Sequence, residues 1–163
     1  MADVFSKQKR SEVMSRIRSR GNAATEIALA KLFRRHGIKG WRRHVQLRIT
    51  NEELRMRAGG SEKIRNSKFR IRHFKVRPDF VFRQARLALF VDGCFWHGCP
   101  KHGTQPAGNR TFWKNKFARN KARDVVVTRT LRRAGWRVLR IWEHELARKH
   151  EARLLKRIQR ALT

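Results

Sequence analysis

Acidic residues are scarce in this sequence, and this scarcity limits the kinds of molecule that the protein is expected to bind. The 163 residues hold 12 Asp and Glu against 42 Lys and Arg, so the formal net charge is +30. Because such a surplus of cations repels itself, we expect a polyanionic partner. Nucleic acid is favoured over an anionic membrane surface, since no basic amphipathic anchor stands apart from the folded pattern.

Long apolar stretches and cysteines are also in short supply. No run approaches the roughly 20 apolar residues of a membrane helix, and residues 1–20 are charged without the apolar core of a signal peptide. The chain has two cysteines, and both lie among histidines, which favours metal binding over a disulfide in a reducing compartment. We therefore expect a cytoplasmic protein that binds DNA or RNA and not a membrane.

Hydrophobic periodicity predicts the first half of the fold. A helix is expected over residues 24–37, ending at a glycine, and a strand over 41–49, where apolar and basic residues alternate. The short apolar runs 77–82 and 86–92 are typical of adjacent buried strands. No internal repeat is found, and the length fits one domain.

The second half of the chain completes a mixed α/β domain. A long basic helix is expected over 110–134, a buried strand over 136–142 and a basic helix over 145–161. Strands interleaved with helices in this order predict a central mixed sheet flanked by helices. The domain is expected to span residues 23–163.

Two basic segments fall outside this pattern. Residues 1–22 form a polar, basic arm in which Val13, Met14 and Ile17 have a sparse helical spacing. We expect this arm to order on its partner, with a disordered solubilising tail as the alternative. Residues 63–77 carry seven Lys and Arg and no acid, which favours a basic hairpin or flap.

The cysteines predict a zinc site. Cys94, Cys99 and His102 place three possible ligands on one tight loop, and zinc favours four tetrahedral ligands drawn from Cys and His. The chain has no third cysteine, so His144, which follows the strand over 136–142, is the best candidate for the fourth. The alternative is a reduced cysteine pair with ordinary histidines.

His97 lies in the same loop but is not needed as a ligand. A loop made rigid by zinc would hold it in a fixed, exposed orientation, and imidazole titrates near neutral pH. His97 is therefore a candidate general base, with a hydrogen-bonded structural histidine as the alternative.

Three acids lie at positions that predict metal-dependent chemistry. Asp79 enters an apolar strand, Asp92 ends the next strand, and Glu26 lies on the first helix. When the two strands pair, Asp79 and Asp92 would meet as Mg²⁺ ligands, which is the arrangement of a metal-dependent nuclease. The alternatives are a salt bridge for Asp79 and a favourable helix-dipole position for Glu26.

Three aromatic residues lie away from any apolar periodic face. Phe95 and Trp96 are in the cysteine loop, and Trp113 begins the long basic helix. Exposed aromatics in basic surroundings stack on bases or insert between base steps. Covering the sheet edge or the metal site is the alternative role.

Several of these stretches together resemble a known family. In chain order, EIALAKLFRRHGI, PDFVF, LALFVDGCFWHGCPKH, TFWKNKFARNKARD and AGWRVLRIWEHEL are similar to the very short patch repair (Vsr) DNA mismatch endonucleases over most of residues 8–148. The resemblance implies a fold similar to type II restriction endonucleases. It also implies a bacterial, nucleoid-associated enzyme that nicks duplex DNA 5′ to the thymine of a T:G mismatch left by deamination of 5-methylcytosine.

The resemblance assigns roles residue by residue. Asp79 matches the Mg²⁺-binding aspartate, His97 the histidine regarded as the base, and Glu26 a functionally important glutamate. Cys94, Cys99, His102 and His144 fill the places of a structural zinc site. Phe95, Trp96 and Trp113 match aromatics that insert next to the mismatch, and Met14 of the arm is a further expected DNA contact.

The chain departs from the family pattern at two places. Some members carry Thr-His where this chain has Val91-Asp92, so the second Mg²⁺ contact would come from the Val91 carbonyl or from Asp92. Members usually reach PDF through a short Pro-Gly turn, whereas a basic insertion at about 48–74 intervenes here. This insertion lies near Asp79 in sequence and could change the substrate.

The sequence therefore predicts an Mg²⁺-dependent nicking endonuclease with a structural zinc. Its expected partners are mismatched duplex DNA and other DNA repair proteins. A monomer is expected, although the sequence does not determine the oligomeric state. The alternatives are a sequence-specific restriction or homing-like endonuclease on the same core and a non-catalytic zinc-containing DNA-binding protein.

Overall fold

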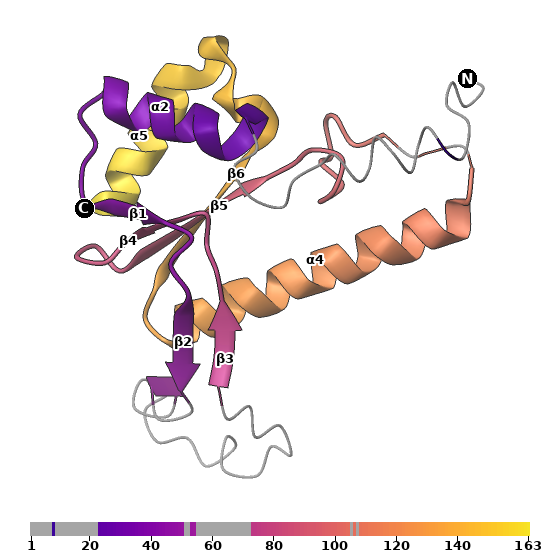
Figure 1. Ribbon diagram of the computed structural model, residues 1–163, viewed down its shortest axis with the longest axis horizontal. Helices are drawn as coiled ribbons and strands as arrows, with labels where there is room; N and C mark the ends of the chain where they lie inside the picture. Colours follow the sequence, from indigo (N-terminus) through magenta and orange to yellow (C-terminus); the bar gives the residue numbers. More distant parts are fainter. Residues whose placement is uncertain (1–7, 9–22, 51–52, 55–72, 105, 107) are drawn as a thin grey trace.

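A mixed four-stranded sheet forms the centre of this computed structural model, which describes residues 8, 23–50, 53–54, 73–104, 106 and 108–163 (Figure 1). The strand order is β1-β4-β5-β6, with β1 at Trp41–Arg43, β4 at Phe80–Phe82, β5 at Leu87–Asp92 and β6 at Arg137–Trp142. β4 is antiparallel to β1 and β5, and β6 is parallel to β5. The predicted mixed α/β fold is confirmed.

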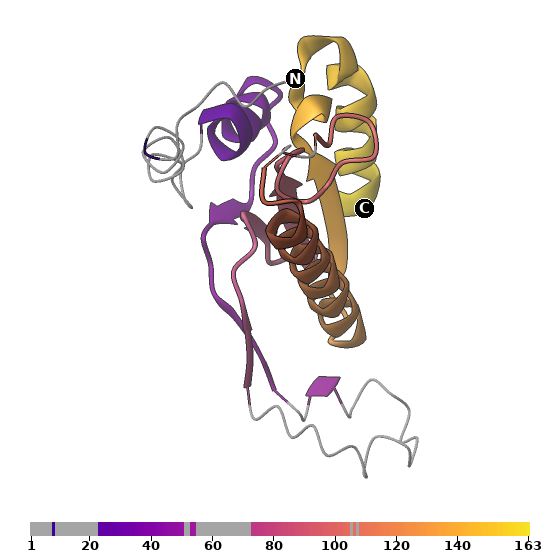
Figure 2. The same cartoon turned by 90° about the vertical axis from the view of Figure 1, so that its right-hand side faces the viewer.

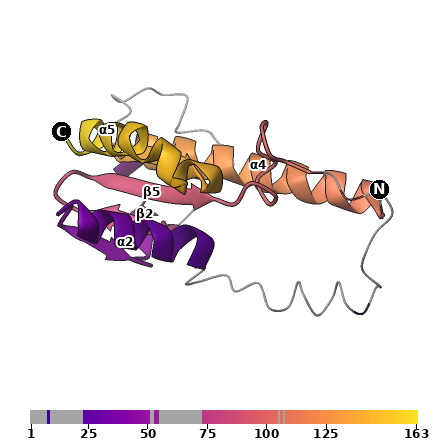
Figure 3. The same cartoon turned by 90° about the horizontal axis from the view of Figure 1, so that it is seen from above.

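Helices cover both faces of this sheet. α2 (Ala28–Arg35) and α5 (Glu151–Leu162) lie along one face, and α4 (Arg110–Arg133) lies along the other. Seen from above, β5 runs between α2 and α5 (Figure 3). A surface ion pair joins the two helices, because the His36 Nε2 lies 2.7 Å from a Glu151 carboxylate oxygen.

Side-chain alternation along the strands explains why two helical layers form. Phe80 and Phe82 pack with α2 and α5, whereas Val81 between them packs with α4. The same alternation divides Leu87 and Leu89 from Ala88. Both faces of the sheet are therefore buried, as expected for strands that read as continuous apolar runs.

The long helix α4 presents one inward stripe. Its members follow a spacing of three or four residues and are Trp113, Phe117, Asn120, Asp124, Val127 and Leu131. The other faces of the helix carry cations, so the stripe determines which side of α4 packs against the sheet. Two polar residues, Asn120 and Asp124, lie within a stripe that is otherwise apolar.

A second, two-stranded sheet extends from the main body (Figure 2). β2 (Leu47–Thr50) pairs antiparallel with β3 (His73–Val76). Of the expected basic hairpin or flap over residues 63–77, the structure describes residues 73–77, and β3 pairs with β2 on the other side of the insertion. Residues 51–52 and 55–72 of the insertion, together with residues 1–7 and 9–22 of the N-terminal arm, including Met14, lie outside the described residues.

Two sequence-based boundaries are wrong. The expected single strand over 41–49 is two strands, because His44 adopts a left-handed φ of 55° and turns the chain from the main sheet to the hairpin. The expected helix over 145–161 begins only at Glu151, after 3₁₀ turns at Glu143–Leu146 and Arg148–His150. The Glu145 side chain accepts a hydrogen bond from the Trp142 backbone N–H, which holds the first of these turns. Among the described residues, no helix is long and apolar enough to span a membrane.

Candidate active site and metal centre

Four buried or half-buried acids gather in one cleft beside the carboxyl end of β5. The cleft has a volume of about 710 Å³, and Glu26, Asp79, Asp92 and Asp124 all line it. Cations stand on its two walls, with Lys75 and Arg77 on the β3 side and Lys116 and Arg123 on α4. The cleft therefore combines an acidic floor with basic walls.

Asp79 enters β4 directly after the buried Pro78. Its Oδ2 accepts a hydrogen bond of 2.7 Å from the Val91 backbone N–H of the neighbouring strand. The pKa of Asp79 is raised to about 6, mainly by burial and also by the charges of Glu26 and Asp92, although the Val91 hydrogen bond and the charge of Arg140 oppose this rise. The expected meeting of Asp79 with the end of β5 is confirmed.

Glu26 is fixed by two basic neighbours. It is 5% exposed and lies in a π-helical turn, Ala23–Ile27, just before α2. Its Oε2 lies 2.8 Å from the Arg43 Nη2 and 3.0 Å from the His44 Nε2. Since the His44 backbone N–H also donates to the Asp79 carbonyl at 3.4 Å, the chain turn at His44 links Glu26 to Asp79.

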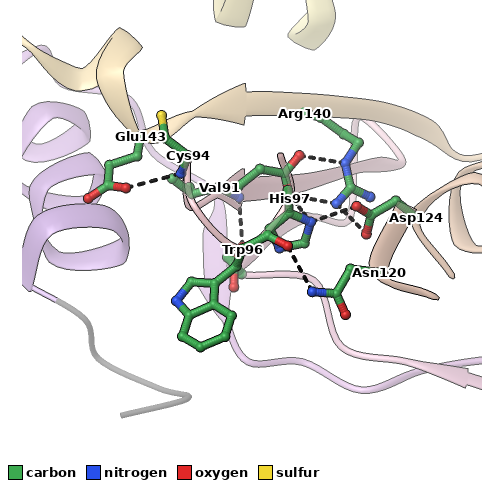
Figure 4. Close-up of polar contacts among 10 residues, drawn as sticks. Val91, Cys94, Trp96, His97, Asn120, Asp124, Arg140 and Glu143 are labelled. Carbon is green, nitrogen blue, oxygen red and sulfur yellow. Dashed lines mark hydrogen bonds and ion pairs between the residues drawn. The ribbon is translucent and has the colours of Figure 1, made fainter. Parts of the chain in front are cut away.

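His97 is held by an aspartate that the sequence analysis did not assign. The His97 Nδ1 lies 2.6 Å from the Asp124 Oδ2 on α4 (Figure 4). Burial alone would raise the pKa of Asp124, but the hydrogen bond to His97 and the charge of Arg140 together lower it below its ordinary value. His97 thus has the orientation partner that a general base requires.

Asp92 is bonded to an arginine, and its role as a metal ligand stays a prediction, since Asp92, His97 and Asp124 also have ligand atoms within 4.8 Å of one another. It is 5% exposed, and both of its carboxylate oxygens accept hydrogen bonds from Arg140 on β6, at 2.7 Å and 2.5 Å. The same guanidinium lies 2.8 Å from Asp124, as Figure 4 shows for the labelled Arg140 and Asp124. Arg140 therefore joins Asp92 to the His97–Asp124 pair.

The positions of Asp124 and Arg140 in the sequence could have indicated that they pair, although the small number of acids alone does not show it. Asp124 is the single acid in a 24-residue basic helix, and it falls on the inward stripe of that helix. Arg140 interrupts the apolar strand over 136–142. A charged residue on an inward position of one element predicts an opposite charge on the element that it faces.

The four residues expected to bind zinc converge. Ligand atoms of Cys94, Cys99, His102 and His144 all lie within 4.8 Å of one another. The His144 Nδ1 is 3.2 Å from the Cys94 Sγ and 3.6 Å from the Cys99 Sγ, and the His102 Nδ1 is 3.9 Å from the Cys99 Sγ. Zinc bonds of about 2.3 Å to sulfur and about 2.0 Å to nitrogen give tetrahedral S···N edges of about 3.5 Å, so the residues fit this metal.

Backbone geometry brings these ligands together. The Cys94 backbone N–H donates to the Glu143 carboxylate at 3.2 Å, which ties the loop to the residue before His144. Gly103 passes so close to the loop that a Cβ would lie 2.5 Å from the Cys99 carbonyl oxygen. Burial raises the pKa of the Cys94 thiol, so a bound cation would be needed to favour its thiolate.

The loop aromatics pack on one another. Phe95 makes edge-to-face contacts with Trp96, Trp113 and Phe117 at centroid distances of 5.1, 5.2 and 5.4 Å. Trp113 is 8% exposed, so the expectation that it is exposed is wrong; Phe95 and Trp96 are half-buried. Phe112, which precedes Trp113 in α4, is the exposed aromatic residue here, with 56% of its surface accessible. The Trp96 carbonyl accepts a 2.8 Å hydrogen bond from Asn120, which fixes the loop against α4.

Comparison with known proteins agrees with this geometry. The family model "DNA mismatch endonuclease Vsr" matches residues 43–102, which contain Asp79, His97 and three of the four clustered metal-type ligands. The type II nicking enzyme V.XorIIP of Xanthomonas oryzae pv. oryzae is 35% identical over 149 residues, covering 90% of this chain and 88% of that protein. The chain belongs to the Vsr family.

Other relatives differ in how much of their length they share with this chain. The DNA mismatch endonuclease Vsr of Escherichia coli is 32% identical over 144 residues, covering 88% of this chain and 74% of that protein. The type II nicking enzyme V.NaeI of Lentzea aerocolonigenes is 56% identical over 71 residues, or 44% of this chain. In that match the chain spans only 43% of the length of V.NaeI.

Proposed function

We propose that this protein is a DNA endonuclease that nicks one strand of a duplex 5′ to the thymine of a T:G mismatch. The observation that carries the proposal is the meeting of Asp79 with the His97–Asp124 pair in one cleft with basic walls. Membership of the Vsr family supports the chemistry and the DNA substrate.

Asp79 is proposed to hold Mg²⁺ together with the Val91 carbonyl. A buried carboxylate whose pKa is raised by burial and by neighbouring acids is the kind of group that a divalent cation stabilises. Mg²⁺ is commonly bound by only one or two carboxylates with water and phosphate oxygens, so one aspartate fits it. Both oxygens of Asp92 are bonded to Arg140, which favours the Val91 carbonyl over Asp92 as the second contact. When bound, Mg²⁺ would stabilise the charge that develops on the phosphate.

His97 is proposed to accept the proton of the attacking water. Because Nδ1 bonds to Asp124, the neutral ring carries its proton there and its lone pair on Nε2. Water loses a proton to Nε2 as its oxygen bonds to phosphorus, and the bond from phosphorus to the leaving oxygen breaks. Asp124 stabilises the imidazolium that forms, as a carboxylate partner does in other histidine-based sites.

Discrimination of the mismatch is proposed to involve the aromatic cluster of Phe95, Trp96, Trp113 and Phe117. Trp96 lines the cleft, and Phe112 beside the cluster is exposed. Unstacking a mispaired base costs less than unstacking a matched one, so an aromatic wedge favours mismatched sites. The buried Trp113 supports Phe95 from behind rather than reaching outward.

Zinc is proposed to have a structural role. Cys94, Cys99, His102 and His144 would fill all four positions of a tetrahedral site, which would leave no open position for a reacting water. The bound metal would stabilise the loop that carries Phe95, Trp96 and His97.

The test is a nicking assay on a complete mismatch panel. Purified protein is incubated with Mg²⁺ and end-labelled duplexes that carry each mismatch or none, and the nicks are mapped. The expected result is one nick 5′ to the thymine of T:G.

His97→Ala and Asp124→Asn should each lower the nicking rate by about 10²–10⁴-fold, the usual range for lost general base catalysis. His36→Gln, on the exposed end of α2, is the matched control and should retain the wild-type rate.

The names of the relatives favour one alternative for the same panel. V.NaeI and V.XorIIP are named type II nicking enzymes, so nicking of a paired site is the second candidate. A discrete nick in the fully matched duplex at a rate equal to that in T:G would establish this second function. Tight binding with no nick in any duplex would overturn both.

A further inference from the structure

The hairpin of β2 and β3 has one apolar face and one basic face. Leu47, Ile49 and Val76 point into the cluster that contains Val127 and Leu131 of α4. Arg48 and Lys75 alternate with these buried residues and are exposed. Because the apolar face is fixed against α4, the direction of the basic face is fixed as well.

Arg48 and Lys75 form an unfavourable pair in the free protein. They are direct cross-strand partners in the β2–β3 register, and like charges directly opposite one another destabilise a sheet. Within the part of the chain that the structure describes, neither takes part in a salt bridge. Glu53, the acid described at the end of this hairpin, accepts a 2.9 Å hydrogen bond from the Thr50 backbone N–H. An anion bound across the pair would offset this repulsion.

The basic face continues into the candidate active site. Arg77 is two residues beyond Lys75, and both are exposed and line the cleft. Lys75 is four residues before Asp79, which corresponds to about 13 Å of extended chain at about 3.3 Å per residue. That reach is less than one turn of duplex DNA, so a phosphate next to the cleaved one would come close to this face.

We propose that Arg48 and Lys75 bind phosphates of the duplex beside the nicked site, so that the hairpin extends the DNA-binding surface beyond the cleft. The proposal rests on the DNA substrate of the proposed function. The contacts are to the backbone, so they add affinity and register without reading sequence. The turnover of bound DNA is set in the cleft, and the hairpin acts on binding.

The experiment compares two charge-matched double variants in duplex DNA binding. Arg48→Gln/Lys75→Gln removes the proposed contacts, and Arg153→Gln/Lys156→Gln removes two exposed cations from α5 on the opposite face of the sheet. Fluorescence anisotropy with a labelled duplex in magnesium-free buffer gives the affinity over a series of KCl concentrations. The hairpin variant should bind more weakly, and its slope of log affinity against log salt should be less negative by about 2, or about 0.9 per lost phosphate contact.

The control variant should keep the wild-type slope, and thermal unfolding should show that both variants are folded. A hairpin variant with the slope of the control would overturn the proposal. Weaker binding to a duplex RNA of the same sequence without weaker binding to DNA would also overturn it, since the partner would then be RNA. If the hairpin variant behaves as expected but the wild type nicks no duplex, the hairpin contact stands and the proposed nuclease function fails.

Discussion

Single carboxylates in this protein have different partners, and the partner determines what each can do. Among the described residues, the Asp79 side chain accepts a hydrogen bond from a backbone N–H and forms no salt bridge, so burial dominates its pKa. Asp92 is bonded through both oxygens to Arg140. Asp124 shares its charge between His97 and Arg140. Three acids of similar intrinsic acidity thus have different environments: Asp79 is bonded to a backbone N–H, Asp92 to an arginine, and Asp124 to a histidine and an arginine.

Asp79→Asn is expected to stabilise the protein in magnesium-free buffer. Asn keeps an oxygen acceptor for the Val91 N–H but removes a charge that burial disfavours. The folded-state pKa of Asp79 is raised to about 6 from 3.8, so its contribution to stability is present below about pH 4 and is lost as the pH rises through 6. The variant lacks this loss and should be more stable above pH 7 by up to about 3 kcal/mol.

Urea unfolding at a series of pH values measures this difference. The gain of the variant should widen between about pH 4 and about pH 6, that is, between the unfolded and folded pKa values of Asp79, and then level off. A gain that is independent of pH, or a loss at neutral pH, would show that Asp79 is not a destabilising charge in the folded protein.

Asp92 and Arg140 are expected to be strongly coupled. Removing Arg140 leaves the buried Asp92 carboxylate without its cation, which typically costs about 3–5 kcal/mol, whereas removing Asp92 leaves Arg140 its contact with Asp124. The double variant Asp92→Asn/Arg140→Gln removes both charges and should be less destabilised than the sum of the single variants, by about 1–3 kcal/mol. A double-mutant cycle by urea unfolding measures the coupling. Additive effects would mean that the pair contributes nothing as a pair.

At the scale of elements, short segments bring the site together where the regular elements end. β5 ends at Asp92 and the loop over 93–104 follows, so the strand end and the metal-type cluster share one edge of the sheet. The 3₁₀ turn Glu143–Leu146 follows β6 and carries His144 to the same edge. Since β5 and β6 are parallel, their carboxyl ends point the same way and the two halves of the cluster meet.

His102→Gln is expected to remove zinc, and His150→Gln is its matched control. Both rings lie near His144, with centroid distances of 4.4 Å and 6.4 Å, but only His102 has a ligand atom in the cluster. Elemental analysis should give one zinc per chain in the wild type and in His150→Gln, and much less in His102→Gln. The melting temperature of His102→Gln should fall by roughly 5–10 °C, since each kcal/mol shifts it by about 2–4 °C at this size. Equal zinc contents in the two variants would contradict the assigned ligand set.

At the scale of the whole molecule, a net charge of +30 sets the background for every local interaction. Acids in the described part of the chain are concentrated in the cleft and at the contacts of α5. Cations cover α4, which carries nine Lys and Arg against one acid. The free protein therefore has a surface that repels itself and attracts a polyanion.

Added KCl is expected to stabilise the free protein. The screening length falls from about 30 Å at 0.01 M salt to about 8 Å at 0.15 M, which weakens repulsion between separated surface cations more than attraction in the close Asp92–Arg140 pair. The melting temperature should rise by a few degrees over this range. A fall would show that close ion pairs, rather than surface repulsion, dominate the electrostatics of the folded state.

The sequence by itself determined most of the regular elements and indicated the four Cys and His residues that the structure brings together. Three features could be predicted from the spacing of residues along the chain: the inward stripe of α4, the buried runs of β4 to β6 and the Cys-His loop. Hydrophobic periodicity detects this kind of local pattern. Asp79 and Glu26 could be predicted as site residues because acids are rare in this chain, and His97 because it lies in the Cys-His loop without being needed as a ligand. The break at His44 could not be predicted, since apolar and basic residues alternate on both sides of it.

Only the tertiary structure decided which charged groups are partners. His97 and Asp124 are 27 residues apart, and Asp92 and Arg140 are 48 apart, so their pairing depends on how α4 and β6 dock on β5. That docking gave Asp92 an arginine partner and gave His97 its aspartate. It also packed Trp113 inside the aromatic cluster. The physical reason is that a local pattern shows that a charge or ring faces inward, whereas the energy of a buried charge is set by the groups that other elements bring to it.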